Sequence, residues 1–226
     1  MNRKGKSLTT KPMVREVVYL DFYNALLQGD RSRCEVIISD LLTQNIDIQD
    51  IYVNVFQKAM YRIGKLWEQN NITIAEEHIA SQIITSLIDT SLKSVKCKEK
   101  CKRKAIVTCI DKEFHQIGAK MVASVFESNG WSSIYMGENM PTRGVLDAIR
   151  LQSPDVVGLS FSLYMNYSRL IDLLDGIQHN FPGQHVVLGG QGMNEKLWDK
   201  ISSYYKGTTY LKSLQEMDIY IRTYEL

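Results

Sequence analysis

Apolar residues up to position 93 recur at helical spacing. The predicted inward-facing stripes are Val14, Val18, Phe22, Ala25 and Leu26; Cys34, Ile37, Ile38, Leu41 and Leu42; Tyr52, Val55, Phe56, Ala59, Ile63 and Leu66; and Ile79, Ile83 and Leu87. Gly29 marks a helix end and Asp30 a helix cap, while Thr73 and Glu76 form a capping box for the last helix. Short connections between four amphipathic helices predict an antiparallel four-helix bundle.

After position 103 the pattern changes to short β-rich runs separated by helix-length segments. The runs are 105–110, 132–136, 155–160, 185–188 and 208–211. Alternating strands and helices with continuous apolar strands predict an α/β fold with a doubly wound, flavodoxin-like parallel sheet of five strands. Ligands of such sheets bind outside the carboxyl ends of the strands, near the point where the strand order reverses.

The two patterns meet in a Lys-rich stretch. Residues 93–104 contain seven Lys or Arg and one Glu, so they carry +6 while the rest of the chain carries −4 of the formal net charge of +2. A basic run can hold an anionic partner, but between two folded halves a solvated linker is favoured. We therefore expect a helical domain over 13–93, a basic linker over 94–103 and an α/β domain over 104–226.

Composition limits the class of protein. The near-neutral charge argues against a protein that mainly binds nucleic acid, and the short apolar runs argue against a membrane span. The basic start at residues 1–6 is not followed by the apolar core of a signal peptide, so a soluble, cytoplasmic protein is expected. Cys97 and Cys101 lack the further Cys or His residues of a zinc site, which favours two solvated thiols over a metal site.

Chemically useful residues follow three of the predicted strands. The first strand leads into Glu113, His115 and Gly118, and the third and fourth end at Ser160-x-Ser162 and Gly189-Gly190. Glu113 is placed to orient one ring nitrogen of His115, which leaves the other nitrogen for a metal. Taken singly, each signal has a simpler explanation, because a loop His often caps a helix and Gly-Gly often forms a turn.

The spacing of these residues is more specific than any one of them. Glu113-x-His115-x-x-Gly118 is followed by 41 residues, then Ser160-x-Ser162, then 26 residues, then Gly189-Gly190. This order and spacing resembles the Asp-x-His-x-x-Gly, Ser-x-Leu and Gly-Gly pattern of the cobalamin-binding domain of methionine synthase, several mutases and corrinoid methyl carriers.

The resemblance implies cobalamin bound base-off, with His115 as the lower axial ligand of cobalt. Ser160 would hydrogen-bond the displaced base, and the two glycines at 189 and 190 would leave room for the nucleotide tail. Gly118 would make room for the corrin edge or the start of the helix. Glu113 replaces the family's Asp, so a longer or differently angled contact with the imidazole is expected, and Ser162 replaces its Leu, which makes the slot for the tail more polar.

A second motif lies in the helical part. Trp67, nine further residues and Glu77-His78 resemble the helical cap of light-responsive adenosylcobalamin regulators, in which the Trp packs on the 5′-deoxyadenosyl group and the Glu and His help to hold it. The simpler alternatives are a core Trp and a solvated first helical turn. Some of these sensors carry a His directly after the Trp, whereas this chain has Glu68, so a bis-histidine photoproduct formed there is not expected.

Three functions are consistent with these patterns. The favoured one is a stand-alone cobalamin-binding sensor of light that uses adenosylcobalamin and signals to itself or to a protein partner. The alternative is a corrinoid methyl carrier that uses methylcobalamin and serves methyltransferases, and the third is a binding module without cobalamin. About twelve residues precede the first helix, so no DNA-binding domain and no direct DNA binding are expected. No catalytic set of the chain's own is apparent, so any chemistry would be the cofactor's.

Overall fold

Local groups between the first two helices set where one ends and the next begins. The computed structural model describes residues 13–95 and 97–224, and it begins with α1 (Glu16–Leu27) and α2 (Arg31–Thr43). Between them Gly29 takes a φ of 70°, and the Asp30 side chain accepts a hydrogen bond from the backbone N–H of Arg33 at 2.9 Å. Both signals predicted from the sequence are therefore confirmed. The buried side of α1 differs from the prediction, since Tyr19 and Tyr23 are buried while Val14 and Val18 are only partly so.

The third helical stretch contains a π-helical segment. It consists of α3 (Ile48–Ile51), η1 (Tyr52–Gln57) and α4 (Lys58–Glu68), which follow one another without a break. The rings of Tyr52 and Phe56 are fully buried, and Phe56 packs on Phe22 of α1 with ring centroids 5.7 Å apart. The wider turn of a π-helix redirects side chains along the stretch. The long third stripe of the sequence thus maps onto one continuous element.

α5 (Ile74–Lys93) starts at the predicted capping box. The Thr73 backbone N–H donates to Glu76 Oε2 at 2.7 Å, and the Glu76 N–H donates to Thr73 Oγ1 at 3.2 Å. The prediction that Ile79 points inward is wrong, because its side chain is 50% exposed. The buried residues of this helix are Ala80, Ile83, Ile84, Leu87, Ile88 and Ser91, so the inward-facing side begins one residue later than predicted.

The chain divides into two compact units. The helical unit ends at Ile83 and the α/β unit begins at Ile84, so the boundary falls inside α5. The basic segment 94–103 contains no helix or strand among its described residues, yet its backbone is paired. Lys98 N–H donates to Ser128 O at 3.0 Å and Cys101 N–H to Gly130 O at 2.9 Å. The segment is therefore fixed to the α/β unit at these two points, and the predicted division into domains at 94–103 stays a prediction.

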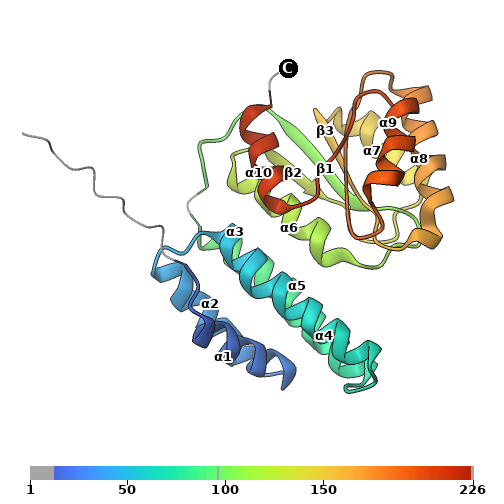
Figure 1. Cartoon of the computed structure of the whole chain (residues 1–226). Coiled ribbons are helices and arrows are strands. Elements are labelled where there is room, and N and C mark those ends of the chain that lie inside the picture. The colour runs from blue at the N-terminus through green and yellow to red at the C-terminus, as the bar shows by residue number, and fades with distance from the viewer. Residues whose placement is uncertain (1–12, 96, 225–226) are drawn as a thin grey trace, which may run out of the picture. The chain divides into compact units, whose positions relative to one another are not determined.

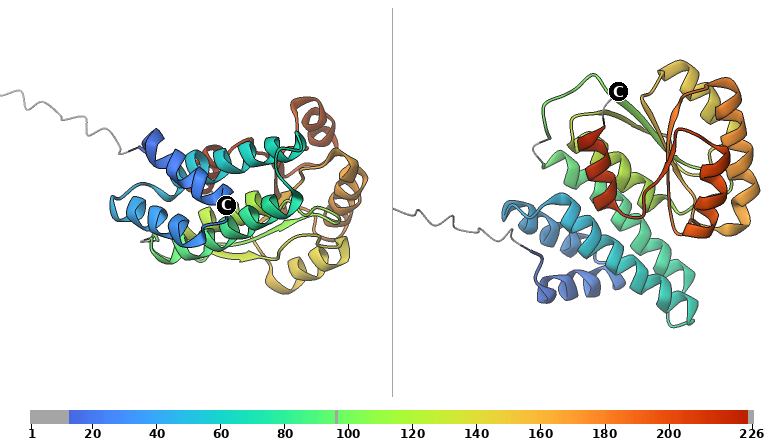
Figure 2. Two further views of the ribbon diagram at one scale, coloured as in Figure 1. Left: turned by 90° about the horizontal axis from the view of Figure 1, so that it is seen from below. Right: turned by 45° about the horizontal axis from the view of Figure 1, so that its top comes forward.

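The α/β unit is built on a parallel five-stranded sheet in the order β2-β1-β3-β4-β5 (Figures 1 and 2). The strands are β1 (Lys104–Cys109), β2 (Ser132–Tyr135), β3 (Val156–Ser160), β4 (His185–Gly189) and β5 (Thr208–Tyr210). The first and last residues of each strand differ from those of the predicted run by at most one residue. The flavodoxin-like strand order is confirmed. The chain turns from one half of the sheet to the other between β1 and β3, which makes the carboxyl ends of these strands the switch point.

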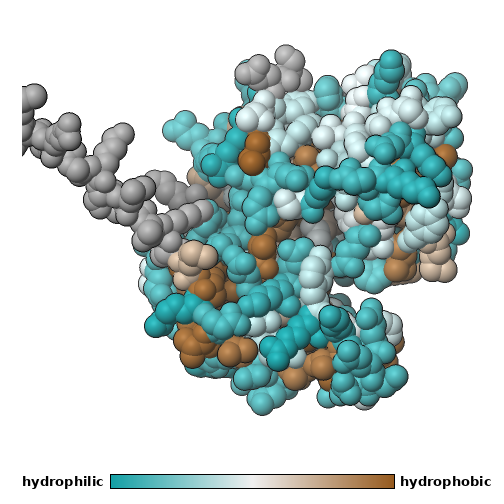
Figure 3. Space-filling model, in the orientation of Figure 1, coloured by the Kyte–Doolittle hydropathy of each residue, from teal (hydrophilic) through white to brown (hydrophobic). Residues whose placement is uncertain are grey.

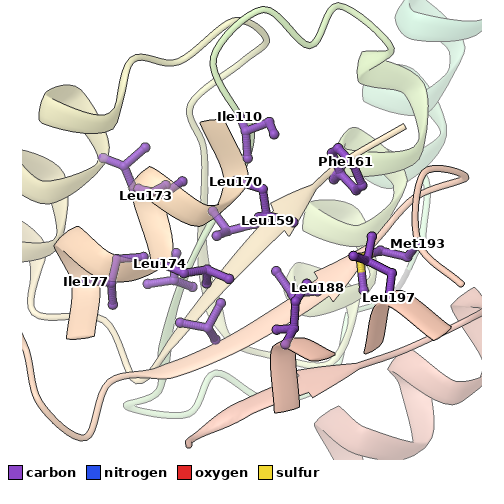
Figure 4. Close-up of a cluster of buried hydrophobic side chains, with 14 of the residues drawn as sticks. Ile110, Leu159, Phe161, Leu170, Leu173, Leu174, Ile177, Leu188, Met193 and Leu197 are labelled. Carbon is purple, nitrogen blue, oxygen red and sulfur yellow. The ribbon is translucent and has the colours of Figure 1, made fainter. Parts of the chain in front are cut away.

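Helices cover both faces of this sheet (Figure 1). One face carries α6 (Gln116–Ser128) and α10 (Leu214–Thr223), and the other carries α7 (Thr142–Gln152), α8 (Tyr167–Asn180) and α9 (Glu195–Tyr204). A short helix, η2 (Tyr164–Asn166), precedes α8. Figure 4 shows the core of the second face, where Leu159 and Leu188 of the sheet meet Leu170 and Leu174 of α8. This packing fixes the sheet from which the loops of the candidate site extend.

The surface is mixed in polarity. Figure 3 shows hydrophobic residues interspersed among hydrophilic ones, and Val17, Leu20 and Val36 are exposed apolar side chains of the helical unit. Among the described residues, no helix combines the length and the apolar character that a bilayer span requires. The predictions about the basic start and about the short segment before the first helix concern residues 1–12, which lie outside the described residues.

Candidate functional site

A buried carboxylate lies at the switch point. Glu113 follows β1, and its side chain is fully buried. Its Oε1 accepts hydrogen bonds from the backbone N–H of His115 at 3.1 Å and from Nδ1 of the same ring at 2.5 Å. Its Oε2 accepts from the backbone N–H groups of Ser162 at 2.8 Å and Leu163 at 2.9 Å, in the loop after β3. One carboxylate thus joins the two loops that flank the switch point.

These donors decide the charge of Glu113. Burial by itself raises the pKa of its carboxyl group, but the hydrogen bonds from the His115 ring and from the Ser162, His115 and Leu163 amides outweigh burial and lower the pKa to about 2. A carboxylate that accepts several N–H bonds is stabilised in its ionised form. Glu113 is therefore an anion at neutral pH, so the Nδ1 atom of His115 carries the proton of their hydrogen bond.

His115 presents its ring outward. It occupies the position just before α6 but makes no side-chain capping hydrogen bond, so the alternative of a helix-capping His does not hold for this side chain. The side chain is 60% exposed, and its Nδ1 is bonded to Glu113. Nε2 is consequently the atom by which the ring would coordinate a metal, in the usual arrangement of a carboxylate-oriented imidazole. The expected lengthening of the contact by Glu in place of Asp is not seen, because the two atoms are 2.5 Å apart.

The serines after β3 contribute differently from each other. Ser160 ends the strand, and its carbonyl oxygen accepts a hydrogen bond from the Ile110 N–H at 3.3 Å. Ser162 reaches the site through its backbone amide, which bonds Glu113. Both residues are partly buried. A hydroxyl contact from Ser160 to a bound base, and a more polar slot at Ser162, stay predictions.

The glycines have distinct surroundings. Gly190 takes a φ of 107°, and a Cβ there would lie 2.3 Å from the carbonyl oxygen of Phe161, so this position needs glycine for backbone packing. A Cβ at Gly189 would meet only Leu211 O, at an ordinary 3.5 Å. A Cβ at Gly118 would meet nothing within 4 Å, which means open space beside the first turn of α6. The predicted role of Gly118 and Gly189 in leaving room for the cofactor stays a prediction, and Gly190 has a structural requirement of its own.

The second motif lies in the helical unit. Trp67 stands in the last turn of α4 with a 45% exposed side chain, so it is not a core residue. In the first turns of α5, His78 Nδ1 is 2.8 Å from Glu77 Oε2, and the Ser81 hydroxyl donates to Glu77 Oε1 at 2.7 Å. The Glu77 side chain is only 23% exposed, whereas that of His78 is 69% exposed. Glu77 and His78 therefore form a second oriented carboxylate–imidazole pair.

Sequence reasoning missed an apolar surface next to His115. Phe114 is 56% exposed, and in the loop after β3 Leu163, Tyr164 and Met165 are 38%, 65% and 82% exposed. Phe114 directly precedes His115, and Leu163 belongs to the loop whose amides bond Glu113, the partner of the His115 ring. The run Phe161-Ser-Leu-Tyr-Met was the available signal, since exposed apolar residues in a loop point to a binding surface.

The site residues fit a cobalt corrinoid. A cobalt corrinoid would need a nitrogen ligand from the chain and open, apolar surroundings for its ring. His115, with its ring oriented by Glu113, would supply the nitrogen, and the exposed Phe114 and Leu163 and the open space at Gly118 would supply such surroundings. Among the described residues, no group of three or more His, Cys, Asp or Glu side chains is arranged to hold a metal ion, and Cys97 and Cys101 are both exposed.

The fold is an α/β unit with a candidate ligand site at the switch point of its parallel sheet, preceded along the chain by a helical unit. Comparison with known families is more specific, because residues 19–90 and residues 103–205 each match a family described as B12 binding domain. The chain belongs to the B12-binding-domain proteins, and it is a cobalamin-binding protein.

The relatives include a transcriptional repressor and corrinoid proteins. The chain is 26% identical over 129 residues to the HTH-type transcriptional repressor CarH of Myxococcus xanthus, a match that covers 57% of this chain and 42% of the repressor. It is 18% identical to trimethylamine corrinoid protein 2 of Methanosarcina acetivorans, covering 92% of this chain and 99% of that protein. The chain thus spans less than half the length of the repressor.

A solved structure shows the same fold over nearly the whole chain. The monomethylamine corrinoid protein of Methanosarcina barkeri superposes with a TM-score of 0.73 at 13% identity, covering 93% of this chain and all of that one. At this identity the likeness establishes the fold alone.

Proposed function

We propose that the protein is a sensor that binds adenosylcobalamin base-off with His115 on cobalt and responds to light. The observation that carries this proposal is the second motif: a half-exposed Trp67 together with the oriented Glu77–His78 pair. In this proposal Trp67 packs on the upper ligand and the Glu77–His78 pair holds it. A purely structural Trp would be expected in the core.

The α/β unit would hold the rest of the cofactor. The Glu113–His115 pair supplies the lower axial nitrogen, Ser160 and Ser162 meet the displaced base, and Gly189 and Gly190 border the nucleotide tail. Gly118 leaves room for the corrin edge. Cobalamin supplies a cobalt–carbon bond that light can break, and the chain's residues orient the cofactor and shield it from water.

Signalling would follow from loss of the upper ligand. Without that ligand Trp67 loses its packing partner. The conformational equilibrium of the helical unit then shifts, as in other two-state elements that a ligand biases. The output would be a change in self-association or in binding to a protein partner. The proposed organisation is a helical domain over 13–93, the basic segment 94–103 and the cobalamin-binding domain over 104–226.

A second candidate is a corrinoid methyl carrier with methyltransferase partners. The match to trimethylamine corrinoid protein 2 over almost the full length of both chains favours it. In that case methylcobalamin would be the working form, and Trp67 would shield the methyl group without recognising an adenosyl group.

One experiment separates the two candidates. The protein is loaded with adenosylcobalamin in the dark and then illuminated while the visible spectrum and the elution volume in gel filtration are recorded. A sensor changes its elution volume with light, and the Trp67→Ala variant loses the change. An unchanged elution volume, combined with methyl transfer from the methylcobalamin-loaded protein to a methyltransferase, contradicts the sensor and supports the carrier.

A further inference from the structure

The loop that carries Glu113 and His115 contains a residue in an unfavourable conformation. Ile110 O accepts a hydrogen bond from Glu113 N–H at 3.0 Å, which closes a tight turn over 110–113. Its third residue, Lys112, has a φ of 61°. Gly or Asn is favoured at such a position, because a side chain at positive φ crowds the backbone. Something else must therefore hold Lys112 in place.

Two asparagines from neighbouring loops hold it. The Asn139 Oδ1 accepts the Lys112 N–H at 2.9 Å, and the Asn166 Nδ2 donates to the Lys112 carbonyl oxygen at 3.0 Å. Asn139 also donates its own N–H to Glu113 O at 2.9 Å. Asn166 is only 5% exposed, so water cannot readily replace the hydrogen bond of its side-chain amide. Loss of this bond would therefore cost free energy of folding.

The two asparagines follow the carboxyl ends of β2 and β3, the two strands that flank β1 in the sheet. Asn139 lies between β2 and α7, where it has a φ of 51°, and Asn166 ends the short helix η2 after β3. A further ion pair, between Arg169 of α8 and Asp111, ties the first half of the turn. The direction in which Glu113 leaves the turn is thus set by loops on either side of β1.

We propose that Asn139 and Asn166 are positioning residues for the lower axial ligand. By holding Lys112 in its left-handed conformation they aim the Glu113 carboxylate at Nδ1 of His115, and so favour the His-on form of the bound corrinoid. This inference rests on the proposed function, because it assigns its effect to coordination by His115.

The matched test uses two variants at position 139 that both tolerate a positive φ. Asn139→Gly removes the acceptor for Lys112, whereas Asn139→Asp keeps an oxygen acceptor in the same place. Each is loaded with adenosylcobalamin, and the His-on fraction is read from the visible spectrum between the limits set by wild type and His115→Ala. Loss of an outer partner of a metal-bound His weakens metal binding by about tenfold or more. We expect weaker binding of this order and a smaller His-on fraction for Asn139→Gly, and near wild-type behaviour for Asn139→Asp.

A second background tests the cause. Lys112→Gly removes the steric cost of the positive φ, so in this background the Asn139→Gly change should cost much less than in wild type. Amide hydrogen exchange of the protein without cobalamin provides a readout free of the cofactor, since the Lys112 amide should exchange faster in Asn139→Gly. Asn166→Leu, which removes the donor to Lys112 O at similar volume, should shift the spectrum in the same direction.

Failure of the inference differs from failure of the proposed function. If wild type and His115→Ala give the same spectrum, the ligand assignment itself is wrong. If those two differ but Asn139→Gly binds and absorbs like wild type, or Asn139→Asp loses as much as Asn139→Gly, the positioning role is overturned.

Discussion

Glu113 Oε1 lies 2.5 Å from Nδ1 of His115, and the carboxylate that makes this contact is fully buried while the ring is mostly exposed. Backbone amides hold the buried carboxylate, and in the proposed function the exposed ring coordinates cobalt. An imidazole held in this way pays little entropy on coordination, since its ring orientation and tautomer are already set.

Replacing the buried carboxylate should cost stability and coordination together. In Glu113→Gln the amide nitrogen faces either the His115 ring or the amides of Ser162 and Leu163, all of which are donors. A buried donor left without an acceptor costs about 1–3 kcal/mol, which urea unfolding of the protein without cobalamin should show. With adenosylcobalamin, the visible spectrum should shift from that of wild type toward that of His115→Ala. The exposed Glu68→Gln serves as a control, and an equal loss in both variants would contradict the role of Glu113.

The same carboxylate predicts a dependence of stability on pH. Its pKa is lowered to about 2 in the folded protein, from an ordinary value near 4.5 in the unfolded chain. A lowered pKa contributes stability that is complete above about pH 4.5 and is lost as the pH falls toward about 2. At about 1.4 kcal/mol per pKa unit the contribution is roughly 3 kcal/mol. Urea unfolding across this range should show the difference between wild type and Glu113→Gln shrinking as the pH falls, and a constant difference would contradict the assignment.

The pairing of Glu113 with His115 could be predicted from the sequence, but the backbone amides that hold Glu113 could not. Glu113 and His115 could be found because their types and spacing are chemical signals, and the strand order followed from the alternation of apolar runs. The donors from residues 162 and 163 are backbone amides, which any residue type provides, so no pattern of side chains announces them. Lys112 is a similar case, because lysine gives no sign of a positive φ. Ile79 was misplaced since adjacent apolar residues fit two helical registers equally well.

Two glycines of the motif should respond in opposite ways to alanine. Gly190→Ala places a Cβ at a φ of 107° and 2.3 Å from Phe161 O, so backbone strain and overpacking together should cost about 2–5 kcal/mol of stability in urea unfolding. Gly118→Ala meets open space in α6 and should keep or slightly raise the stability of the protein without cobalamin.

Cobalamin binding separates the two changes further. If the corrin edge occupies the space at Gly118, the Gly118→Ala variant should bind adenosylcobalamin more weakly despite its intact fold, as measured by equilibrium dialysis. Unchanged affinity in this variant would show that the open space beside α6 is not part of the corrin site.

Substitutions of the exposed Trp67 and the buried Trp131 test whether Trp67 packs on the upper ligand of the cofactor. Trp131 is 5% exposed and packs on Phe126 with ring centroids 5.0 Å apart, so Trp131→Ala should cost about 3–5 kcal/mol of stability. Trp67 is 45% exposed, so Trp67→Ala should cost about 1 kcal/mol or less.

The functional effects of the two substitutions should be reversed. Trp67→Ala removes the flat apolar surface that is proposed to pack on the adenosyl group, so the ratio of the dissociation constants for methylcobalamin and adenosylcobalamin should fall toward one, while binding of the corrin through His115 persists. In Trp131→Ala, measured at a temperature where the variant is folded, this ratio should match wild type. Preserved discrimination in Trp67→Ala would remove the main support for an adenosylcobalamin sensor and leave the methyl carrier as the better account of the chain.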